Sequence, residues 1–503
     1  MYVPSYTQIQ TSNNLNSQET LSKKAVAGGT WVIILRIANR GLDFVRTIIL
    51  ARLLSPMDFG LLGIALLSMS MLDTFSQTGL KVALIQKKEN IESYLDTAWT
   101  ISVLRGLALF TLLFASAPMI AIFFNSPQAT AVIRVIALST LLTGSQNIGI
   151  LYFQKELDFK KYSLYQISIT VAHVFATITL ALILRNVWAL VLGSLFANVV
   201  GAFLSYAIHH YRPRFAFEKE KALELLSFGK WILFSTIVVF FARQGDDLFL
   251  GKILGVTALG FYQMAFFIGN IPSSEITGTV STVVFPAYAK LIATPQKLNT
   301  AYLRTLSLIF LISFPLAGGI CILAPNFTSL FLGEKWLPIV LPLQILAISG
   351  LIRSVVGTGG SLFNAIGKPR FDFKMNLWRL FITFITIYPL TKLWGISGTS
   401  LAVLLGLLAS SYFWLQESIR NLKISLNTVF VMLLPPLIST FSMLLAIFFV
   451  ILLLSPLNYP LLSFFVSSIF GISVYIGVIL AIDRVSTSNI HNEIKFIFKN
   501  LRI

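Results

Sequence analysis

The amino-acid sequence predicts an all-α polytopic membrane protein. Three observations carry this prediction: 56% of the 503 residues are hydrophobic, only 12% are charged, and the mean hydropathy is +0.81. The hydrocarbon core of a bilayer is about 30 Å thick, so a helix needs roughly 20 apolar residues to cross it. Fourteen stretches are long and apolar enough to do so: residues 28–51, 58–79, 97–117, 129–152, 163–184, 187–208, 228–251, 258–284, 303–324, 337–360, 374–391, 395–416, 427–453 and 460–482.

The net charge of +18 comes from basic residues that lie mostly between the apolar stretches. Counted from the amino terminus, most of them fall in alternate connections, which include Lys87, Lys160, Arg212 and Lys368. This is the positive-inside distribution, and it predicts that both termini lie in the cytoplasm. No nucleic-acid-binding motif accompanies the charge, so no nucleic-acid partner is expected.

A direct repeat divides the chain into lobes. Without gaps, residues 29–60 match residues 229–260 at an offset of 200, and Gly60 matches Gly260. Six predicted helices separate the copies, so the two six-helix lobes form a parallel repeat about a pseudo-two-fold along the membrane normal. The predicted domains are a disordered cytoplasmic tail (1–22), an N-lobe (23–208), a basic cytoplasmic linker (209–227), a C-lobe (228–417), and two C-terminal helices with a cytoplasmic tail (418–503).

The connections leave no room for a soluble catalytic domain. None exceeds about twenty residues, and the sequence lacks the GxxxxGK[ST] phosphate-binding loop of many ATPases. Cys321 is the only cysteine, so an internal disulfide or a cysteine metal cluster is excluded. We therefore expect no enzymatic activity, no cofactor and no metal. Transport would run on an ion gradient, the membrane potential or the gradient of the transported molecule.

Several motifs resemble the Wzx-type oligosaccharide flippases of the multidrug/oligosaccharidyl-lipid/polysaccharide exporter superfamily, above all the colanic acid and teichuronic acid exporters. They are Ala51–Leu61 (ARLLSPMDFGL), Gly79–Lys87 (GLKVALIQK), Phe153–Lys161 (FQKELDFKK), Val187–Gly193 (VWALVLG), Phe285–Leu291 (FPAYAKL), Leu332–Pro338 (LGEKWLP) and Gly367–Arg370 (GKPR).

The resemblance implies a fourteen-helix, two-lobed flippase in the bacterial inner membrane. Its substrate would be a polyprenyl-pyrophosphate-linked oligosaccharide for cell-surface polysaccharide such as exopolysaccharide or lipopolysaccharide. Its expected partners are the lipid bilayer, a polysaccharide polymerase and a chain-length regulator, and the protein is expected to be a monomer. The family offers no agreed set of functional residues, so the site has to be predicted from the charges.

The first apolar stretch carries Arg36, Arg40, Asp43 and Arg46. A charge at the bilayer centre costs roughly 2.5–3.5 kcal/mol on an insertion scale, so these side chains should face protein or a water-filled cavity. Residues 36, 40 and 43 share one helical face. Guanidinium binds phosphate in a bidentate manner, so Arg36 and Arg40 are expected to hold the pyrophosphate. The alternative is a structural ion pair with a neighbouring helix.

The seventh stretch carries Arg243, Asp246 and Asp247. At the repeat offset, Asp43 corresponds to Arg243 and Arg46 corresponds to Asp246, so the charges are exchanged between the lobes. Facing each other, Asp43–Arg243 and Arg46–Asp246 would form salt bridges that gate the outer side, with Asp247 beside them. The alternative is pairing within each helix at i, i+3 spacing.

Single ionisable residues occupy other stretches. Arg105, Arg134 and Arg353 are expected to line the substrate cavity, whereas Arg379 lies close enough to the end of its stretch to be a topology signal.

Two isolated carboxylates, Asp73 and Glu275, lie in corresponding helices of the lobes and are candidates for ion coupling, because a buried carboxylate can carry a proton. A hydrogen bond to a neighbouring group is the simpler alternative for both. His173 is a weaker candidate.

Three other functions compete. A multidrug cation exporter of the same superfamily should have an acidic, aromatic pocket, but arginine outnumbers carboxylates in these stretches. A flippase for the lipid-linked peptidoglycan precursor also has fourteen helices and a cationic cavity, but the motifs fit the polysaccharide branch better. A membrane polymerase or glycosyltransferase normally needs larger loops.

Overall fold

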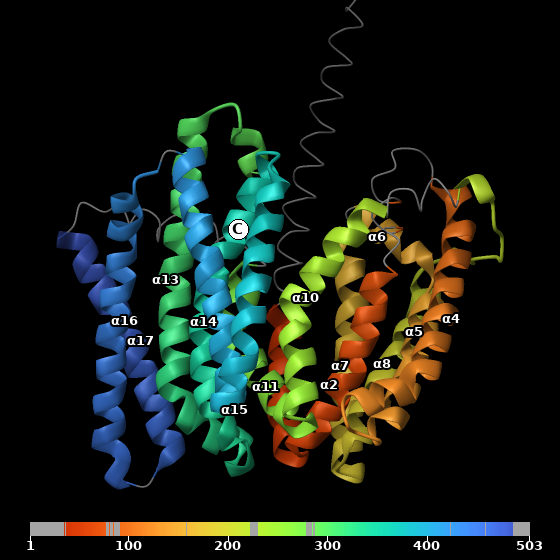
Figure 1. The fold of residues 1–503 in the computed structure, drawn as a ribbon, viewed down its shortest axis with the longest axis horizontal. Helices are drawn as coiled ribbons and strands as arrows, with labels where there is room; N and C mark the ends of the chain where they lie inside the picture. Colours follow the sequence, from red (N-terminus) through yellow and green to blue (C-terminus); the bar gives the residue numbers. More distant parts are fainter. Residues whose placement is uncertain are drawn as a thin grey trace, which may run out of the picture. The chain divides into compact units, whose positions relative to one another are not determined.

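The structure is a computed structural model whose described residues form helices and their connections, and no strand occurs among them (Figure 1). Besides residues 35, 80, 84 and 284, it describes residues 37–76, 91–156, 158–221, 230–277, 287–422, 424–457 and 459–485. These residues fall into two compact units. The predicted tail 1–22 lies outside them.

The first unit comprises Met1–Leu54 and Ile64–Ile237. Its described helices include 37–53, most of α2 (Pro56–Phe75), α4 (Glu92–Phe123), α5 (Ala129–Gly144), α6 (Leu151–Lys155), α7 (Phe159–Leu184) and α8 (Val187–Ile208).

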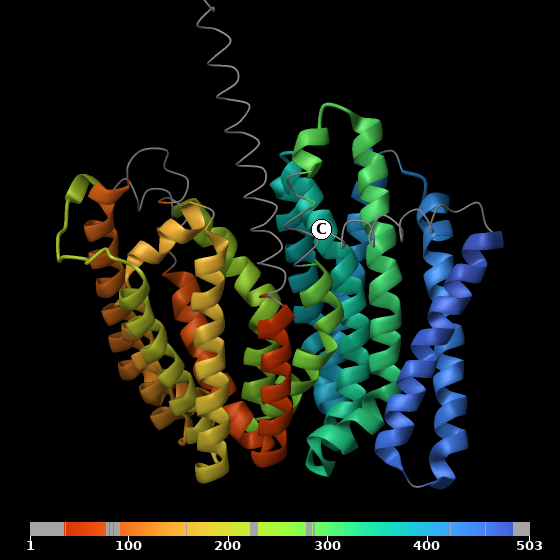
Figure 2. The same ribbon diagram turned by 180° about the vertical axis from the view of Figure 1, so that it is seen from behind.

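Within this unit α4 packs along α5, and α7 packs along α8 (Figures 1 and 2). A Cβ atom added to Gly106 would lie 2.6 Å from the carbonyl oxygen of Thr140, so α4 and α5 approach closely only because position 106 has no side chain. The Thr140 hydroxyl donates to the Gly106 carbonyl at 3.1 Å, which fixes the crossing by a hydrogen bond.

The segment 209–217, which follows α8, is extended and docks on α4. The Tyr211 hydroxyl and the Arg214 backbone N–H both donate to the Asp96 carboxylate, and the Ala216 N–H donates to the Thr100 hydroxyl at 3.1 Å. Burial and the hydrogen bond to Asp96 raise the pKa of Tyr211, so its hydroxyl stays a donor at neutral pH. The first part of the predicted linker is therefore fixed to this unit.

The second unit comprises Ser55–Gly63 and Val238–Ile503. Its helices include the larger part of α10 (Lys230–Ile253), then α11 (Val256–Gly269), α13 (Pro295–Phe327), α14 (Val340–Ala365), α15 (Pro369–Leu422), α16 (Leu426–Leu454) and α17 (Pro460–Val485).

The backbone of α15 leaves helical geometry at Gly395 (φ 57°, ψ −132°), a conformation that favours glycine. The element of 54 residues is therefore two helices joined at a sharp break. α16 and α17 pack against each other and against α13.

The start of α2 is fixed by its own sequence. Ser55 precedes the helix, and Pro56 is its first residue. The Ser55 N–H donates to the Asp58 carboxylate at 2.8 Å, and the Asp58 N–H donates to the Ser55 hydroxyl at 3.3 Å. This reciprocal arrangement is a capping box. The first turns of α2 belong to the second unit, where the Phe59 ring meets the fully buried Trp336 edge-on, with ring centroids 5.3 Å apart.

The membrane character predicted from the sequence is confirmed. Among the described residues, nine helices are long and apolar enough to cross a membrane, and the pair Ala129–Gly144 and Ile148–Lys155, bent by 65°, adds a tenth if it is one span. One of the nine, Arg370–Leu422, has 53 residues and contains the break at Gly395. The all-α polytopic fold is thus established, and the number of fourteen helices stays a prediction.

We predict that Trp336→Ala lowers the free energy of unfolding by about 3–5 kcal/mol, because it removes a large, fully buried side chain and leaves a cavity. The matched control is Trp394→Ala, since that side chain is 59% exposed. Thermal unfolding of both purified variants in detergent measures the difference. Equal losses of stability would contradict the packing role of Trp336.

Candidate functional site

Two charges of helix 37–53, Asp43 and Arg46, are paired within the first unit. Arg46 Nη2 lies 3.3 Å from the Asp43 carboxylate one turn earlier, and Arg46 Nη1 lies 2.5 Å from His173 Nδ1 on α7. Guanidinium can only donate, so the His173 nitrogen that faces it accepts. The i, i+3 pairing that the spacing allowed is therefore formed. His173 was predicted only as a weak candidate for ion coupling, because a lone histidine in an apolar helix does not reveal its partner.

A polar cluster lies inside the second unit around Asp246 of α10. This carboxylate is 6% exposed, accepts a hydrogen bond from the Tyr262 hydroxyl of α11, and attracts Arg353 of α14 and Arg379 of α15 electrostatically. Arg379 was predicted to be a topology signal near the end of its helix. In the structure its side chain is only 9% exposed and belongs to this cluster. Its position along the sequence did not reveal what packs over it.

Arg353 is held on two sides. Its Nη1 donates to Asn270 Oδ1 at 2.6 Å, and its guanidinium carbon lies 4.8 Å from the centre of the Phe266 ring. Its Nε and Nη2 atoms are buried and have no hydrogen-bond partner among the described residues. These two nitrogens form one edge of the guanidinium fork, which matches the oxygens of a phosphate or carboxylate.

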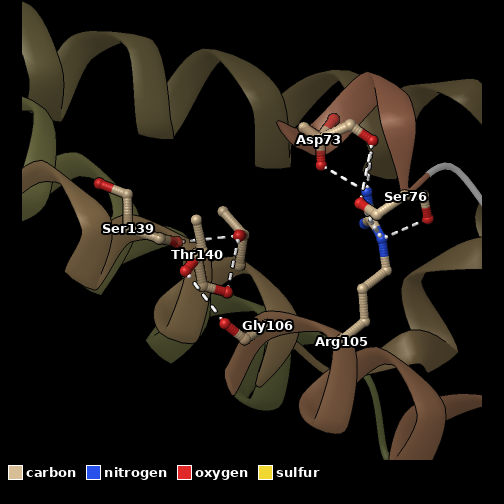
Figure 3. A network of polar contacts seen from close by, with 7 residues as sticks. Asp73, Ser76, Arg105, Gly106, Ser139 and Thr140 are labelled. Atoms are coloured by element: carbon tan, nitrogen blue, oxygen red, sulfur yellow. Dashed lines mark hydrogen bonds and ion pairs between the residues drawn. The ribbon is translucent and has the colours of Figure 1, made fainter. Parts of the chain in front are cut away.

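Arg105 of α4 is bound to the end of α2 (Figure 3). Its Nη2 donates to the Asp73 carboxylate at 2.6 Å, and its Nε donates to the Ser76 carbonyl at 2.9 Å. Arg105 and Asp73, predicted as a cavity residue and an ion-coupling residue, thus form one ion pair. Their 32-residue separation in sequence gave no sign of it.

The other predicted site residues lie on several different helices. The Arg134 guanidinium lies 4.8 Å from the Phe114 ring centre, Arg40 is half-buried on helix 37–53, and Arg243 is exposed on α10. Asp247, beside Asp246, has one carboxylate oxygen that is buried without a hydrogen-bond partner in the described part of the chain.

Two predicted residues have no described side chain. Arg36 lies outside the described residues, and Glu275 belongs to the π-helical turn Pro272–Thr277. Among the described residues, no group of three or more His, Cys, Asp or Glu side chains is suited to holding a metal ion.

Comparison with known proteins identifies the family. A family model described as "Polysaccharide biosynthesis protein" matches residues 49–341, more than half of the chain. The chain belongs to this family. The resemblance to polysaccharide exporters that the motifs predicted is thereby confirmed.

Curated relatives extend over most of the chain. The lipopolysaccharide biosynthesis protein WzxC of Escherichia coli K12 is 28% identical over 434 residues, which cover 84% of this chain and 88% of the relative. The teichuronic acid biosynthesis protein TuaB of Bacillus subtilis 168 is 26% identical and covers 69% of this chain and 73% of its own length.

Solved structures show the same fold. The lipid II flippase MurJ in an inward closed conformation aligns with a TM-score of 0.74 over 90% of this chain and 99% of MurJ, at 16% identity. An inward-facing multidrug resistance transporter of the MATE family aligns with a TM-score of 0.61 over 78% of this chain and 99% of its own, also at 16% identity. At this identity the likeness concerns the fold alone.

We predict that Asp73 and Arg105 stabilise the first unit through their ion pair. Their exposed fractions are 54% and 27%, so solvent screening limits the coupling free energy to about 0.5–1 kcal/mol. A double-mutant cycle of Asp73→Ala and Arg105→Ala measures it by unfolding in detergent.

The pair Asp158–Lys161 is the control for this cycle. Its nitrogen and oxygen lie 3.2 Å apart, the lysine is 61% exposed, and its coupling should be smaller. Additive effects of the two substitutions at positions 73 and 105 would contradict the predicted coupling.

Proposed function

We propose that the protein is a flippase that moves a polyprenyl-pyrophosphate-linked oligosaccharide from the cytoplasmic to the outer leaflet of the bacterial inner membrane by alternating access. The observation that carries this proposal is the family match over residues 49–341. The family membership supports a polysaccharide precursor as cargo, and the fold likeness to a lipid flippase supports movement across the bilayer as the activity.

The chemistry of such a cargo demands cations inside the membrane. A pyrophosphate group carries several negative charges and cannot enter hydrocarbon without compensation. Arg36 and Arg40 supply two guanidinium groups one helical turn apart on the first helix. Arg353 offers a buried guanidinium edge without a protein partner among the described residues, which supports its predicted role in cargo binding. At Arg105 a cargo would have to displace Asp73 and Ser76.

The competing functions receive less support. A cation exporter should have an acidic, aromatic pocket, whereas arginine outnumbers carboxylates in the apolar stretches of this chain. A peptidoglycan-precursor flippase shares the fold, but the family match favours polysaccharide biosynthesis. The family match and the fold likeness to transporters favour transport over a polymerase or glycosyltransferase activity, so the protein is proposed not to be an enzyme.

Both termini lie in the cytoplasm, as the positive-inside distribution predicts. Asp73 and Glu275 are the candidates for coupling transport to an ion gradient. The cargo passes to a polysaccharide polymerase that works with a chain-length regulator, and the flippase acts as a monomer.

We predict that Arg36→Ala and Arg40→Ala each reduce polysaccharide export roughly tenfold to a hundredfold, because each removes charged hydrogen bonds worth about 1.5–3 kcal/mol. Arg36→Lys and Arg40→Lys should retain part of the export, since the charge survives without the bidentate geometry. Polysaccharide produced by a deletion strain that expresses each variant is the measurement.

Arg420→Ala, an exposed position at the end of α15, is the control for the arginine substitutions and should export normally. The amount of each variant in the membrane must match the wild type. Full export by the Arg36→Ala, Arg40→Ala double variant would exclude these residues from cargo binding.

We predict that the charge reversal Asp43→Arg reduces export about tenfold or more, because it places like charges together, and that adding Arg243→Asp recovers a substantial part. This is the result expected if Asp43–Arg243 and Arg46–Asp246 close the outer side. Cysteines at positions 43 and 243 should also cross-link when the cavity faces the cytoplasm. Failure of the double reversal to rescue export would leave only the pairing within helix 37–53.

A further inference from the structure

The strap, residues 209–221, leaves α8 at the level where the hydrocarbon core of the membrane ends. The 22 residues of α8 include no Asp, Glu, Lys, Arg or His. At the α-helical rise of about 1.5 Å per residue they span about 33 Å, close to the thickness of the hydrocarbon core. The residues after Ile208 therefore begin in the headgroup layer. The positive-inside distribution predicts that this is the cytoplasmic leaflet.

α4 begins on the same side of the membrane and belongs, like α8 and the strap, to the first unit. From position 106 to its last residue, Phe123, α4 carries no charged side chain. Its first turns, residues 92–105, contain Glu92, Asp96 and Arg105. A contact further along α4 is therefore a contact deeper in the membrane.

The strap dips toward the hydrocarbon core and returns, beside the beginning of α4 (Figures 1 and 2). It first binds Asp96. The Ala216 N–H then donates to the Thr100 hydroxyl at 3.1 Å, and the Lys221 amine finally donates to the Ser93 carbonyl at 2.9 Å. By helical rise, Thr100 lies about 6 Å deeper than Asp96 and about 10 Å deeper than Ser93. Ala216 is therefore the tip of the strap.

The tip carries two exposed phenylalanine side chains. Phe215 and Phe217 flank Ala216 and are 73% and 59% exposed. The Phe215 ring also meets the buried Trp99 of α4 edge-on, with ring centroids 4.8 Å apart, so its position is fixed. Transfer of a large apolar side chain out of water is favourable. Two such side chains on a fixed tip at headgroup level therefore favour insertion among lipids, as at the apolar face of an interfacial helix.

Exposed cations flank the tip on both sides. Arg214 directly precedes the two phenylalanines and Lys219 follows them by two residues, and both side chains are exposed. Of the two acidic residues nearby, Glu218 is paired with Lys221 at 2.7 Å, and Glu220 follows Lys219 in the chain. Basic side chains beside an inserted apolar surface attract anionic lipids, whose phosphate oxygens they bind.

We propose that the strap is a membrane-docking element. Phe215 and Phe217 insert into the headgroup layer of the predicted cytoplasmic leaflet, and Arg214 and Lys219 bind the headgroups of anionic phospholipids. The occupant is a lipid surface, because a strap that starts where α8 leaves the hydrocarbon core already lies among headgroups, and its tip matches them in apolarity and charge. The hydrogen bonds to Asp96 hold the tip at this depth. The docking does not depend on which cargo the protein moves.

A spin label tests the depth of the tip. Cys321→Ser protein with Phe217→Cys is labelled with a nitroxide and reconstituted in vesicles of phosphatidylcholine and phosphatidylglycerol. Oxygen concentrates in lipid and a nickel chelate stays in water, so we expect accessibility to oxygen to exceed accessibility to nickel several-fold. The matched control is Glu220→Cys, an exposed position of the same strap where nickel should prevail. Water-like values at both positions would overturn the proposal and leave the tip as a surface for another protein.

The preference for anionic lipid has a separate test. Bimane on the cysteine at position 217 is quenched by phosphatidylglycerol or phosphatidylcholine that carries a nitroxide near the top of its acyl chain. We expect phosphatidylglycerol to quench several-fold more, and Arg214→Gln with Lys219→Gln to make the two lipids equal. Position 214 keeps its backbone hydrogen bond to Asp96 in this variant. Lys297→Gln, an exposed position of the second unit, should keep the preference. Equal quenching in the parent protein would refute binding of anionic lipid.

The role of Asp96 can be tested with the same spin label. Asp96→Ala removes the acceptor of the Tyr211 hydroxyl and of the Arg214 N–H, so the label at position 217 should gain mobility and its oxygen-to-nickel ratio should fall several-fold. Glu220→Ala is the matched control and should leave both readings unchanged. A label that keeps its mobility and depth in Asp96→Ala would contradict the claim that these hydrogen bonds hold the tip.

Discussion

A charge inside a hydrocarbon layer must be neutralised by another group of the same protein, and this constraint organises the polar residues of the chain. Arg46 forms an ion pair with Asp43 and a hydrogen bond with His173. Arg105 forms an ion pair with Asp73. Asp246 accepts a hydrogen bond from Tyr262 and interacts electrostatically with two arginines. Each of these partners belongs to the same compact unit as the charged residue it contacts. A unit that contains its own compensation can move without leaving a bare charge behind, which suits a transporter that changes its conformation.

The same pairing would allow the proposed anionic cargo to bind without a large penalty. A carboxylate that neutralises a guanidinium can be exchanged for a phosphate, because one negative charge replaces another and the hydrogen bonds keep their geometry. Asp73 on Arg105 is suited to such an exchange, since its carboxylate is 54% exposed. Arg353 differs, because Nε and Nη2 are buried without a partner in the described part of the chain while Asn270 and Phe266 fix its orientation. A fixed guanidinium loses less entropy on binding than a mobile one.

Much of the fold follows from the sequence, because apolar length and the placement of basic residues report directly on the cost of crossing a bilayer. The contacts of the candidate site could not be predicted from the sequence in the same way. Asp73 and Arg105 lie 32 residues apart, and Arg46 and His173 lie 127 residues apart, so their contacts depend on how helices pack. Arg379 was misjudged for the same reason: depth in a helix can be counted along the sequence, but burial depends on neighbouring helices.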